Sequence, residues 1–305
     1  MNDTSSGLLR PRVILAFLLT GAIWGSTWLV ITGQISGVPA AWSVFYRFAL
    51  ATPALFAVAA LMKRRLGLTG AEHRLAAIVG VLQFSGNFLF VYHAELYMTS
   101  GVVALMFGLM MVPNAVLGRL FLGERAHGGF TLGSAIAIVG VSLLLVHEWQ
   151  ANPDAGVIGG NVGLGIGLTV LGMLAASLAN VVQANDLGRG VPMVSLLAWA
   201  MVYGTVFNLA FAGLTAGVPT IPTQPQFWMG TLYLALIGSV ITFPLHYNLV
   251  REIGAGRTAY NGILTISVAM LLSSVVEDYR WTGLTAGGMG LAVLGMVLAL
   301  RSKRA

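Results

Sequence analysis

The sequence predicts an all-α integral membrane protein with ten transmembrane helices. Hydrophobic residues make up 57% of the 305 residues, whereas Asp, Glu, Lys and Arg together make up only 9%. Soluble domains carry about 25% charged residues, so this chain lacks the charged coat that a water-soluble protein of its length needs. Its abundance of Leu, Val, Ile and Phe also excludes an intrinsically disordered chain.

Ten apolar runs have the length of about 20 residues that a bilayer-crossing helix needs. They cover residues 13–32, 40–62, 75–94, 99–121, 129–147, 163–185, 193–215, 227–249, 257–276 and 282–300. The first run follows Arg10 and Arg12 but lacks a small-residue cleavage site, so we expect a retained span rather than a signal peptide. The short connections leave no room for a soluble domain.

The distribution of Lys and Arg predicts the orientation of these spans. With the N-terminus in the cytoplasm, fourteen of the 16 basic residues fall in cytoplasmic segments. Only Arg280 falls outside, and Arg47 lies within a span. Basic residues are retained on the cytoplasmic side. We therefore expect a multi-pass protein of the inner (plasma) membrane with both termini in the cytoplasm.

Composition and missing motifs exclude other classes. The net charge is +6, but the basic residues are scattered between apolar runs, so no nucleic-acid partner is expected. Cysteine is absent, which excludes disulfides and a Cys metal site. The sequence contains no nucleophile elbow, zinc-protease motif, phosphate loop or dinucleotide fingerprint. We expect no enzyme, no catalytic residue, no metal and no cofactor.

The two halves of the chain, 1–150 and 151–305, repeat each other. Matching positions recur in order about 151–155 residues apart: Gly21 with Gly172, Ser26 with Ser177, Pro39 with Pro192, Gly101 with Gly256, Gly133 with Gly288 and Gly140 with Gly295. Each half has five helices, an odd number, so the second half enters the membrane from the opposite side. Such inverted repeats are typical of secondary transporters, which bind substrate near the midplane between the halves.

The sequence also resembles the drug/metabolite transporter superfamily, in its ten-helix EamA-type branch. The segments that carry the resemblance are Ile23-Trp24-Gly25-Ser26, Tyr46-Arg47-Phe48, 94–105, Leu122-Gly123-Glu124-Arg125 with Gly133 and Gly140, and 254–259. Two features depart from the family pattern: Glu277-Asp278 replaces a Gly-Glu-Arg, and the ninth helix lacks the proline that the first half keeps as Pro113. The resemblance implies an exporter of metabolites, and within the branch it is greatest to exporters of aromatic and other neutral amino acids of the YddG kind.

Polar residues in hydrocarbon are costly and are therefore candidate binding groups. Arg47 could hold a substrate carboxylate or, alternatively, bond backbone carbonyls near Pro53. Two amide pairs each share a helix face and suit both ends of a zwitterion, although they could equally join helices. The pairs are Gln83 with Asn87 and Asn180 with Gln183.

Aromatic side chains and one histidine complete the candidate site. Trp24, Trp28, Tyr92, Tyr203 and Tyr247 could line a pocket for an apolar side chain, or serve as interfacial anchors. His246 could take a proton near neutral pH, or be structural like His93. Three prolines, Pro53, Pro113 and Pro244, should kink their helices.

The sequence therefore predicts a secondary transporter that exports small zwitterionic metabolites, above all aromatic and other neutral amino acids, by alternating access. No Asp or Glu lies at a span centre, and Glu95 comes closest, at an outer end. We accordingly expect facilitated export, or weak proton linkage through a histidine. A drug or other metabolite carrier on the same fold is the first alternative. An intramembrane enzyme or lipid-handling protein is the second. The expected partners are the substrate and the lipid bilayer, and the oligomeric state stays open.

Overall fold

The computed structural model describes residues 10–123, 128–151, 161–253, 258 and 260–301, and every regular element within them is a helix. In chain order the elements are α1 (Pro11–Ile35), α2 (Ala40–Leu61), α3 (Gly70–Val79), η1 (Gly80–Asn87), α4 (Phe88–Ala94), α5 (Ser100–Gly108), α6 (Met111–Leu122), α7 (Gly128–Ala151), α8 (Val162–Gln183), α9 (Asp186–Gly190), α10 (Met193–Ala216), α11 (Pro225–Leu232), η2 (Tyr233–Ile241), α12 (Thr242–Ile253), α14 (Asn261–Val276) and α15 (Gly283–Arg301). The predicted all-α membrane fold is confirmed.

Nine helical stretches among the described residues are long and apolar enough to cross a membrane. Each coincides with a run predicted from the sequence. The tenth expected span, 257–276, corresponds to α14, a shorter apolar helix of 16 residues. Residues 254–257 and 259, where that span was expected to begin, lie outside the described residues, as do Glu124 and Arg125 of the fifth resemblance segment.

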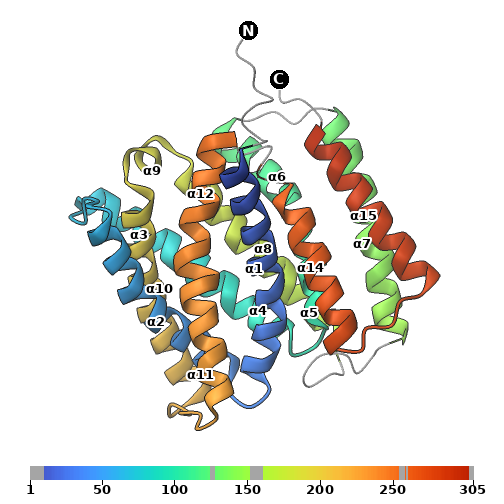
Figure 1. Cartoon of the computed structure of the whole chain (residues 1–305), viewed down its shortest axis with the longest axis horizontal. Helices are drawn as coiled ribbons and strands as arrows, with labels where there is room; N and C mark the ends of the chain where they lie inside the picture. Colours follow the sequence, from blue (N-terminus) through green and yellow to red (C-terminus); the bar gives the residue numbers. More distant parts are fainter. Residues whose placement is uncertain (1–9, 124–127, 152–160, 254–257, 259, 302–305) are drawn as a thin grey trace.

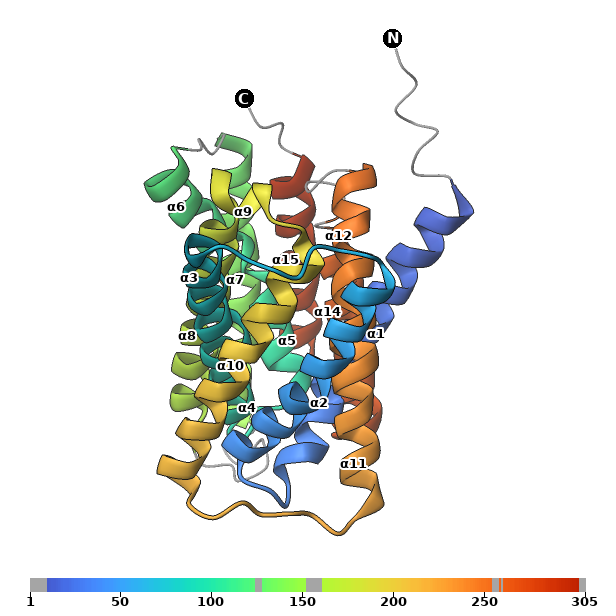
Figure 2. The ribbon, with the colours of Figure 1, turned by 90° about the vertical axis from the view of Figure 1, so that its left-hand side faces the viewer.

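The helices form one bundle in which α1 begins and α15 ends at the same end (Figure 1). We call this the near end and the opposite one the far end. In Figure 2, α2 and α10 lie side by side on one face, and α7 and α15 run along the opposite flank in Figure 1. Large apolar side chains such as Leu61 and Leu214, 83% and 88% exposed, face outward. Such exposure is expected where lipid, not water, surrounds the bundle.

Glycines allow α7 and α15 to touch at the backbone. A Cβ atom on Gly133 would lie 2.6 Å from the carbonyl oxygen of Gly295, and one on Gly140 would lie 2.5 Å from that of Gly288. In lipid no hydrophobic effect drives helices together, and small residues instead allow close van der Waals packing between the two backbones. The two glycine contacts therefore fix how closely these helices approach.

The third span of each half contains a π-helical segment, η1 in the first half and η2 in the second. A π-helix bonds i to i+5, and in η2 serine and threonine hydroxyls support that register. Ser239 donates to the Leu234 carbonyl at 2.9 Å, and Thr242 donates to the Ile237 carbonyl at 2.6 Å. π-Helical turns often mark functional positions.

The three predicted proline kinks have different outcomes. Helix α2 continues through Pro53 to Leu61. Pro113 lies in the first turn of α6, where its missing N–H is no loss, so the fourth span is broken into α5 and α6 before the proline rather than kinked at it. Pro244 stands near the start of α12, directly after η2. The altered register before Pro244 accommodates the backbone bond that a proline cannot make.

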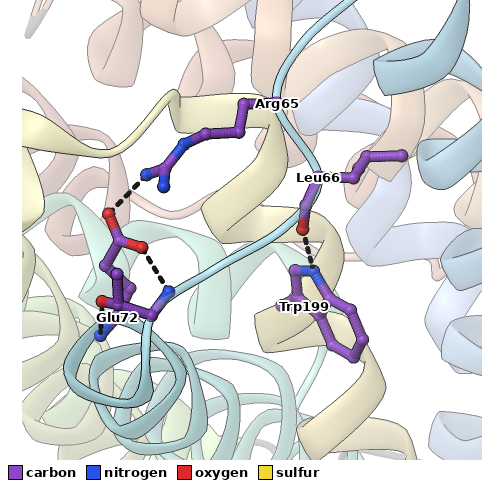
Figure 3. A network of polar contacts seen from close by, with 5 residues as sticks. Arg65, Leu66, Glu72 and Trp199 are labelled. Atoms are coloured by element: carbon purple, nitrogen blue, oxygen red, sulfur yellow. Dashed lines mark hydrogen bonds and ion pairs between the residues drawn. The ribbon is translucent and has the colours of Figure 1, made fainter.

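A polar network fixes the connection between α2 and α3 at the near end (Figure 3). Arg65 donates to Glu72, and Glu72 with Thr69 forms a capping box that begins α3. The indole N–H of Trp199, on α10, donates to the Leu66 carbonyl at 2.8 Å. The connection is thus tied to helices from both halves of the chain.

The glycine contact between α7 and α15 can be tested with two neighbouring glycines of α15. An added Cβ on Gly288 would lie 2.7 Å from the Gly140 carbonyl oxygen, whereas one on Gly290 would meet nothing within 4 Å. We expect Gly288→Ala to destabilise the purified protein by about 1–3 kcal/mol because the helices must move apart. This should lower the midpoint of thermal unfolding in detergent by a few degrees.

Gly290→Ala is the matched control, and it should leave the midpoint unchanged or raise it slightly because alanine favours a helix. Equal midpoints for the two variants would contradict the described packing.

Candidate functional site

Arg47 is a buried cation about two turns from the start of α2. Its side chain is 3% exposed although it lies within a membrane span. Its Nε and Nη2 donate to the Ser239 hydroxyl at 3.3 and 3.2 Å, and its Nη1 donates to the Tyr92 hydroxyl at 3.4 Å. The guanidinium also lies 4.4 Å from the ring centroid of Phe88. All three neighbours are uncharged, so among the described residues no carboxylate neutralises Arg47.

The π-helical register of η2 explains why Ser239 can reach Arg47. Ser239 is fully buried, donates its proton to the Leu234 carbonyl, and so presents its lone pairs to the guanidinium. Tyr92, on α4, is also fully buried. One second-half residue and one first-half residue therefore orient the same cation.

Aromatic side chains from both halves surround Trp24 and Trp28 of α1. The Trp24 indole donates to the Gly238 carbonyl at 3.2 Å, and its ring contacts Phe243 and His246 with centroids 5.5 and 4.7 Å apart. Trp28 contacts Phe107 at 5.1 Å. These rings are partly buried. They form an aromatic group beside η2, the segment that also carries Ser239.

The amide residues divide into two groups. Asn180 of α8 donates to the Asn114 side chain of α6 at 3.3 Å, which joins the two halves. Asn87, at the end of η1, is 5% exposed and its Oδ1 is buried without a hydrogen-bond partner. Gln183 instead turns back to the Ala179 carbonyl of its own helix, leaving its Oε1 without a partner.

The structure does not bring every candidate residue to the aromatic group around Trp24 and Trp28. The Tyr203 hydroxyl pairs with His73 Nδ1 at 3.0 Å, between α10 and α3, so Tyr203 supports the bundle instead of joining Trp24. His93 bonds the Leu89 carbonyl of its own helix, as expected for a structural histidine. Gln83 is partly buried on η1. The Tyr247 side chain lies outside the described residues.

A second polar group lies at the far end and includes two carboxyl groups. Thr32 Oγ1 is 3.0 Å from Glu95 Oε2 and 3.4 Å from Glu277 Oε1. Ser100 donates to Glu277 from its backbone N–H at 3.1 Å and from its hydroxyl at 2.6 Å. Thr32, Glu95, Ser100 and Glu277 are called the far-end cluster below. Its members come from α1, the 95–99 connection, α5 and the end of α14.

Glu95 differs from an ordinary loop carboxyl because it is fully buried. It belongs to the connection that follows the Gly70–Ala94 span. Burial raises the pKa of the Glu95 carboxyl well above its usual range, and the nearby Glu277 raises it further, against weaker opposing effects of Thr32 and Arg47. The neutral form of Glu95 is therefore favoured.

Several of these residues were not among the candidates from the sequence. Asn114 and Phe107 carry no signal beyond being a polar and an aromatic residue in an apolar span. Ser239 depends on the π-helical register, which the sequence did not predict. Glu277 is the exception, because its departure from the family pattern already marked it.

Two apolar pockets lie away from Arg47. One, of about 370 Å³, is lined by residues of α7 and α8 that include Leu145, Trp149 and Ile166. The other, of about 250 Å³, is lined by residues of α6 and α8 that include Pro113 and Met173. Only Pro113, expected as a kink, is a candidate residue, so neither pocket is the site expected for a zwitterion.

Known proteins share both the sequence pattern and the fold. The EamA-like transporter family matches this chain twice, at residues 11–146 and 163–301. A solved crystal structure superposes with a TM-score of 0.65 at 17% identity, covering 94% of this chain and 96% of that one. That likeness shows the fold alone.

Three relatives align over most of their length. A "Probable amino-acid metabolite efflux pump" of Escherichia coli strain K12 is 25% identical, covering 97% of this chain and 98% of the relative. A "Probable terminal-alkyne amino-acid exporter" of Streptantibioticus cattleyicolor is 25% identical, covering 92% and 91%. "Protein PagO" of Salmonella typhimurium is 21% identical, covering 95% and 92%. With its two family matches, its apolar spans and its all-helical bundle, this chain is a multi-pass membrane transporter that belongs to the EamA-like transporter family.

Proposed function

We propose that this transporter exports small zwitterionic metabolites, with aromatic and other neutral amino acids as the best-matched substrates. The observation that carries the proposal is Arg47, a buried cation with uncharged partners beside an aromatic group. The names of two relatives, an amino-acid metabolite efflux pump and an alkyne amino-acid exporter, agree with this substrate class. The substrate would bind between the halves near the middle of the membrane.

A substrate carboxylate would complete the contacts of Arg47. A guanidinium has five N–H donors in a fork that matches a carboxylate, and three of them are engaged by Ser239 and Tyr92. A buried charge is costly unless it is paired, and here the neighbours supply only hydroxyls and the Phe88 ring. The two remaining donors and the unneutralised charge favour an anionic ligand group.

The amide side chains suit the ammonium group. Asn87 Oδ1 is an acceptor without a partner, and Asn114 with Asn180 offers further amide atoms between the halves. Gln83, which shares η1 with Asn87, and Gln183, which shares α8 with Asn180, remain in the proposed site. Trp24, Trp28, Phe107, Phe243 and His246 would surround the side chain of the substrate.

Alternating access follows from the proposal that residues 1–150 and 151–305 are inverted repeats. The repeat pairs Thr52 with Thr205, and their hydroxyls lie 3.1 Å apart across α2 and α10. It also pairs Gly133 with Gly288 and Gly140 with Gly295. Replacing each glycine by its repeat partner turns the contact Gly133–Gly295 into the contact Gly288–Gly140, and both contacts are present. Both halves also carry a π-helical segment in the third span. These reciprocal contacts support a pseudo-two-fold axis.

The orientation follows from the basic residues. We infer that the near end, where α1 begins and α15 ends, faces the cytoplasm and that the protein resides in the inner membrane. Of the alternatives, a carrier of organic phosphates would favour several buried cations, and Arg47 is the only Lys or Arg among the buried residues that the structure describes. Other drug or metabolite carriers on this fold are separated by the substrate panel below. An intramembrane enzyme or lipid-handling protein would chemically change or move a lipid without exchanging amino acids.

Counterflow in proteoliposomes with a panel of labelled amino acids tests the role of Arg47. The wild-type protein should exchange aromatic and neutral amino acids. Arg47→Ala should raise the KM about tenfold to a hundredfold, because a charge-assisted hydrogen bond contributes about 1.5–3 kcal/mol. Arg47→Lys should rescue only part of the loss, since an ammonium lacks the bidentate fork.

The control is Arg12→Ala, which removes an exposed arginine that pairs with Glu252 at the near end. Its KM should match that of the wild type. The proposal fails if Arg47→Ala keeps the wild-type KM, or if no amino acid of the panel is exchanged.

The aromatic group predicts which substrates lose most when Trp24 is removed. Trp24→Ala should raise the KM for phenylalanine about tenfold while changing the KM for alanine much less, because a small side chain leaves the rings largely uncontacted. Trp149→Ala, at a tryptophan that is 59% exposed, is the matched control and should change neither KM. An equal rise for phenylalanine and alanine would argue against an aromatic side-chain pocket.

A further inference from the structure

The far-end cluster brings the carboxyl groups of Glu95 and Glu277 to the hydroxyl of Thr32, so the number of hydrogens available for these two contacts matters. A threonine hydroxyl has one hydrogen and can donate it to one carboxylate at a time. Thr32 lies within hydrogen-bond distance of both Glu95 and Glu277. With both carboxyls charged, the two contacts would have to share this single hydrogen, and the two carboxylates would repel each other.

The partners of the two carboxyls show where the extra proton belongs. Glu277 accepts two hydrogen bonds from Ser100, as a charged carboxylate does. Glu95 has Thr32 as its only described partner, and its second oxygen, Oε1, is buried without one. A protonated Glu95 would donate to Thr32 Oγ1, which would in turn donate to Glu277. This chain of hydrogen bonds satisfies both contacts with one proton.

A second observation points to the same place. The Ser273 hydroxyl is fully buried without a partner, one turn before Glu277 on α14. A Cβ on Gly101 would lie 3.0 Å from it, so Ser273 borders the segment that carries Ser100. The cluster thus holds unused hydrogen-bonding capacity in a region where Met98 and Val162 are only 1% and 5% exposed.

Few other charged or titratable groups face Glu95. Arg47 of α2 acts on Glu95 at longer range, and the hydroxyl of Tyr92, on the preceding helix α4, is bonded to Arg47. His93 is bound to the Leu89 carbonyl, and Asp278 is exposed. Thr32 on α1 and Ser100 on α5 are uncharged.

We propose that Glu95 is a proton-binding site that closes the far end of the transporter. On closure, one proton from water at the far end joins Glu95, and the neutral carboxyl links α1, the 95–99 connection, α5 and α14 through Thr32 and Glu277. On opening, the same proton returns to the same side, so the cycle moves no net proton across the membrane. The inference rests on the proposed alternating access and adds a pH control to it.

The sign of the pH dependence follows from this step. Closure takes up a proton, so low pH favours the closed far end and high pH favours the open one. A step that binds one proton shifts its equilibrium by at most about tenfold per pH unit. The effect lies on the equilibrium between the two states rather than on substrate affinity.

The absence of cysteine from the chain allows a direct test without background labelling. Met98→Cys places a thiol at a position that is buried while the far end is closed. Gly37→Cys, at an exposed position beside the same end, corrects for the intrinsic pH dependence of the thiol reaction. The two single-cysteine proteins are incorporated in lipid nanodiscs and labelled with a polar maleimide between pH 5 and 8, with both faces accessible.

The labelling rate of Met98→Cys, relative to Gly37→Cys, should rise with pH by up to about tenfold per unit. In the Glu95→Gln background it should be low and independent of pH, because glutamine is neutral and can still donate to Thr32. The matched control, Glu252→Gln at the near end, should keep the wild-type pH dependence. Val162→Cys serves as a second reporter, should Met98→Cys fail to fold.

A relative labelling rate that does not change with pH overturns the proposal, and so does a Glu95→Gln variant that keeps the wild-type slope. The labelling needs no substrate. Failure of amino acid counterflow with intact pH-dependent labelling would therefore count against the proposed substrate and not against the proton site.

Discussion

Hydrocarbon offers no partner to a guanidinium, and this constraint shapes the middle of the bundle around Arg47. Three things reduce the cost of the buried charge: two hydroxyls and an aromatic face. Ser239 can serve because η2 has a π-helical register, and Tyr92 can serve because α4 packs against α2. None of these contacts neutralises the charge. A protein that retains such a group in a membrane span gains most from it when an anionic ligand arrives.

The same scarcity of polar partners explains the far end of the bundle. There Thr32 lies within hydrogen-bond distance of both Glu95 and Glu277, and the proposed neutral Glu95 would satisfy both contacts with one proton. Helices α7 and α15, by contrast, meet through glycines that bring the two backbones into direct contact. A tightly packed pair of this kind can move as one unit, while the polar cluster can make and break contacts. In the proposed mechanism, the glycine-packed pair serves as the scaffold and the far-end cluster serves as the gate.

Much of the fold could be predicted from sequence because hydropathy and basic-residue counts respond to the membrane itself. The apolar runs coincide with the helices to within a few residues, and Arg47 was recognisable as the one basic residue inside a span. The π-helical segments were not predictable, because hydropathy does not report the backbone register; in η2 that register is accompanied by hydrogen bonds from Ser239 and Thr242 to carbonyls five residues earlier. Tyr203 is an aromatic residue within a span and was therefore a candidate for lining the pocket. Its hydroxyl instead pairs with His73, because the packing of α10 against α3 sets the direction of its side chain. Glu95 and Glu277 are 182 residues apart, and only the folded chain brings them to one hydroxyl.

Recognition of a substrate carboxylate by Arg47 can be measured most directly as a coupling between protein and ligand. The affinities of phenylalanine and of its uncharged amide for the purified wild-type protein and for Arg47→Ala form a closed cycle. The account predicts that the amide binds the wild-type protein at least tenfold more weakly than the acid, and that this difference disappears in the variant. If acid and amide differ equally in both proteins, Arg47 does not hold the carboxylate, and the proposed binding mode is wrong.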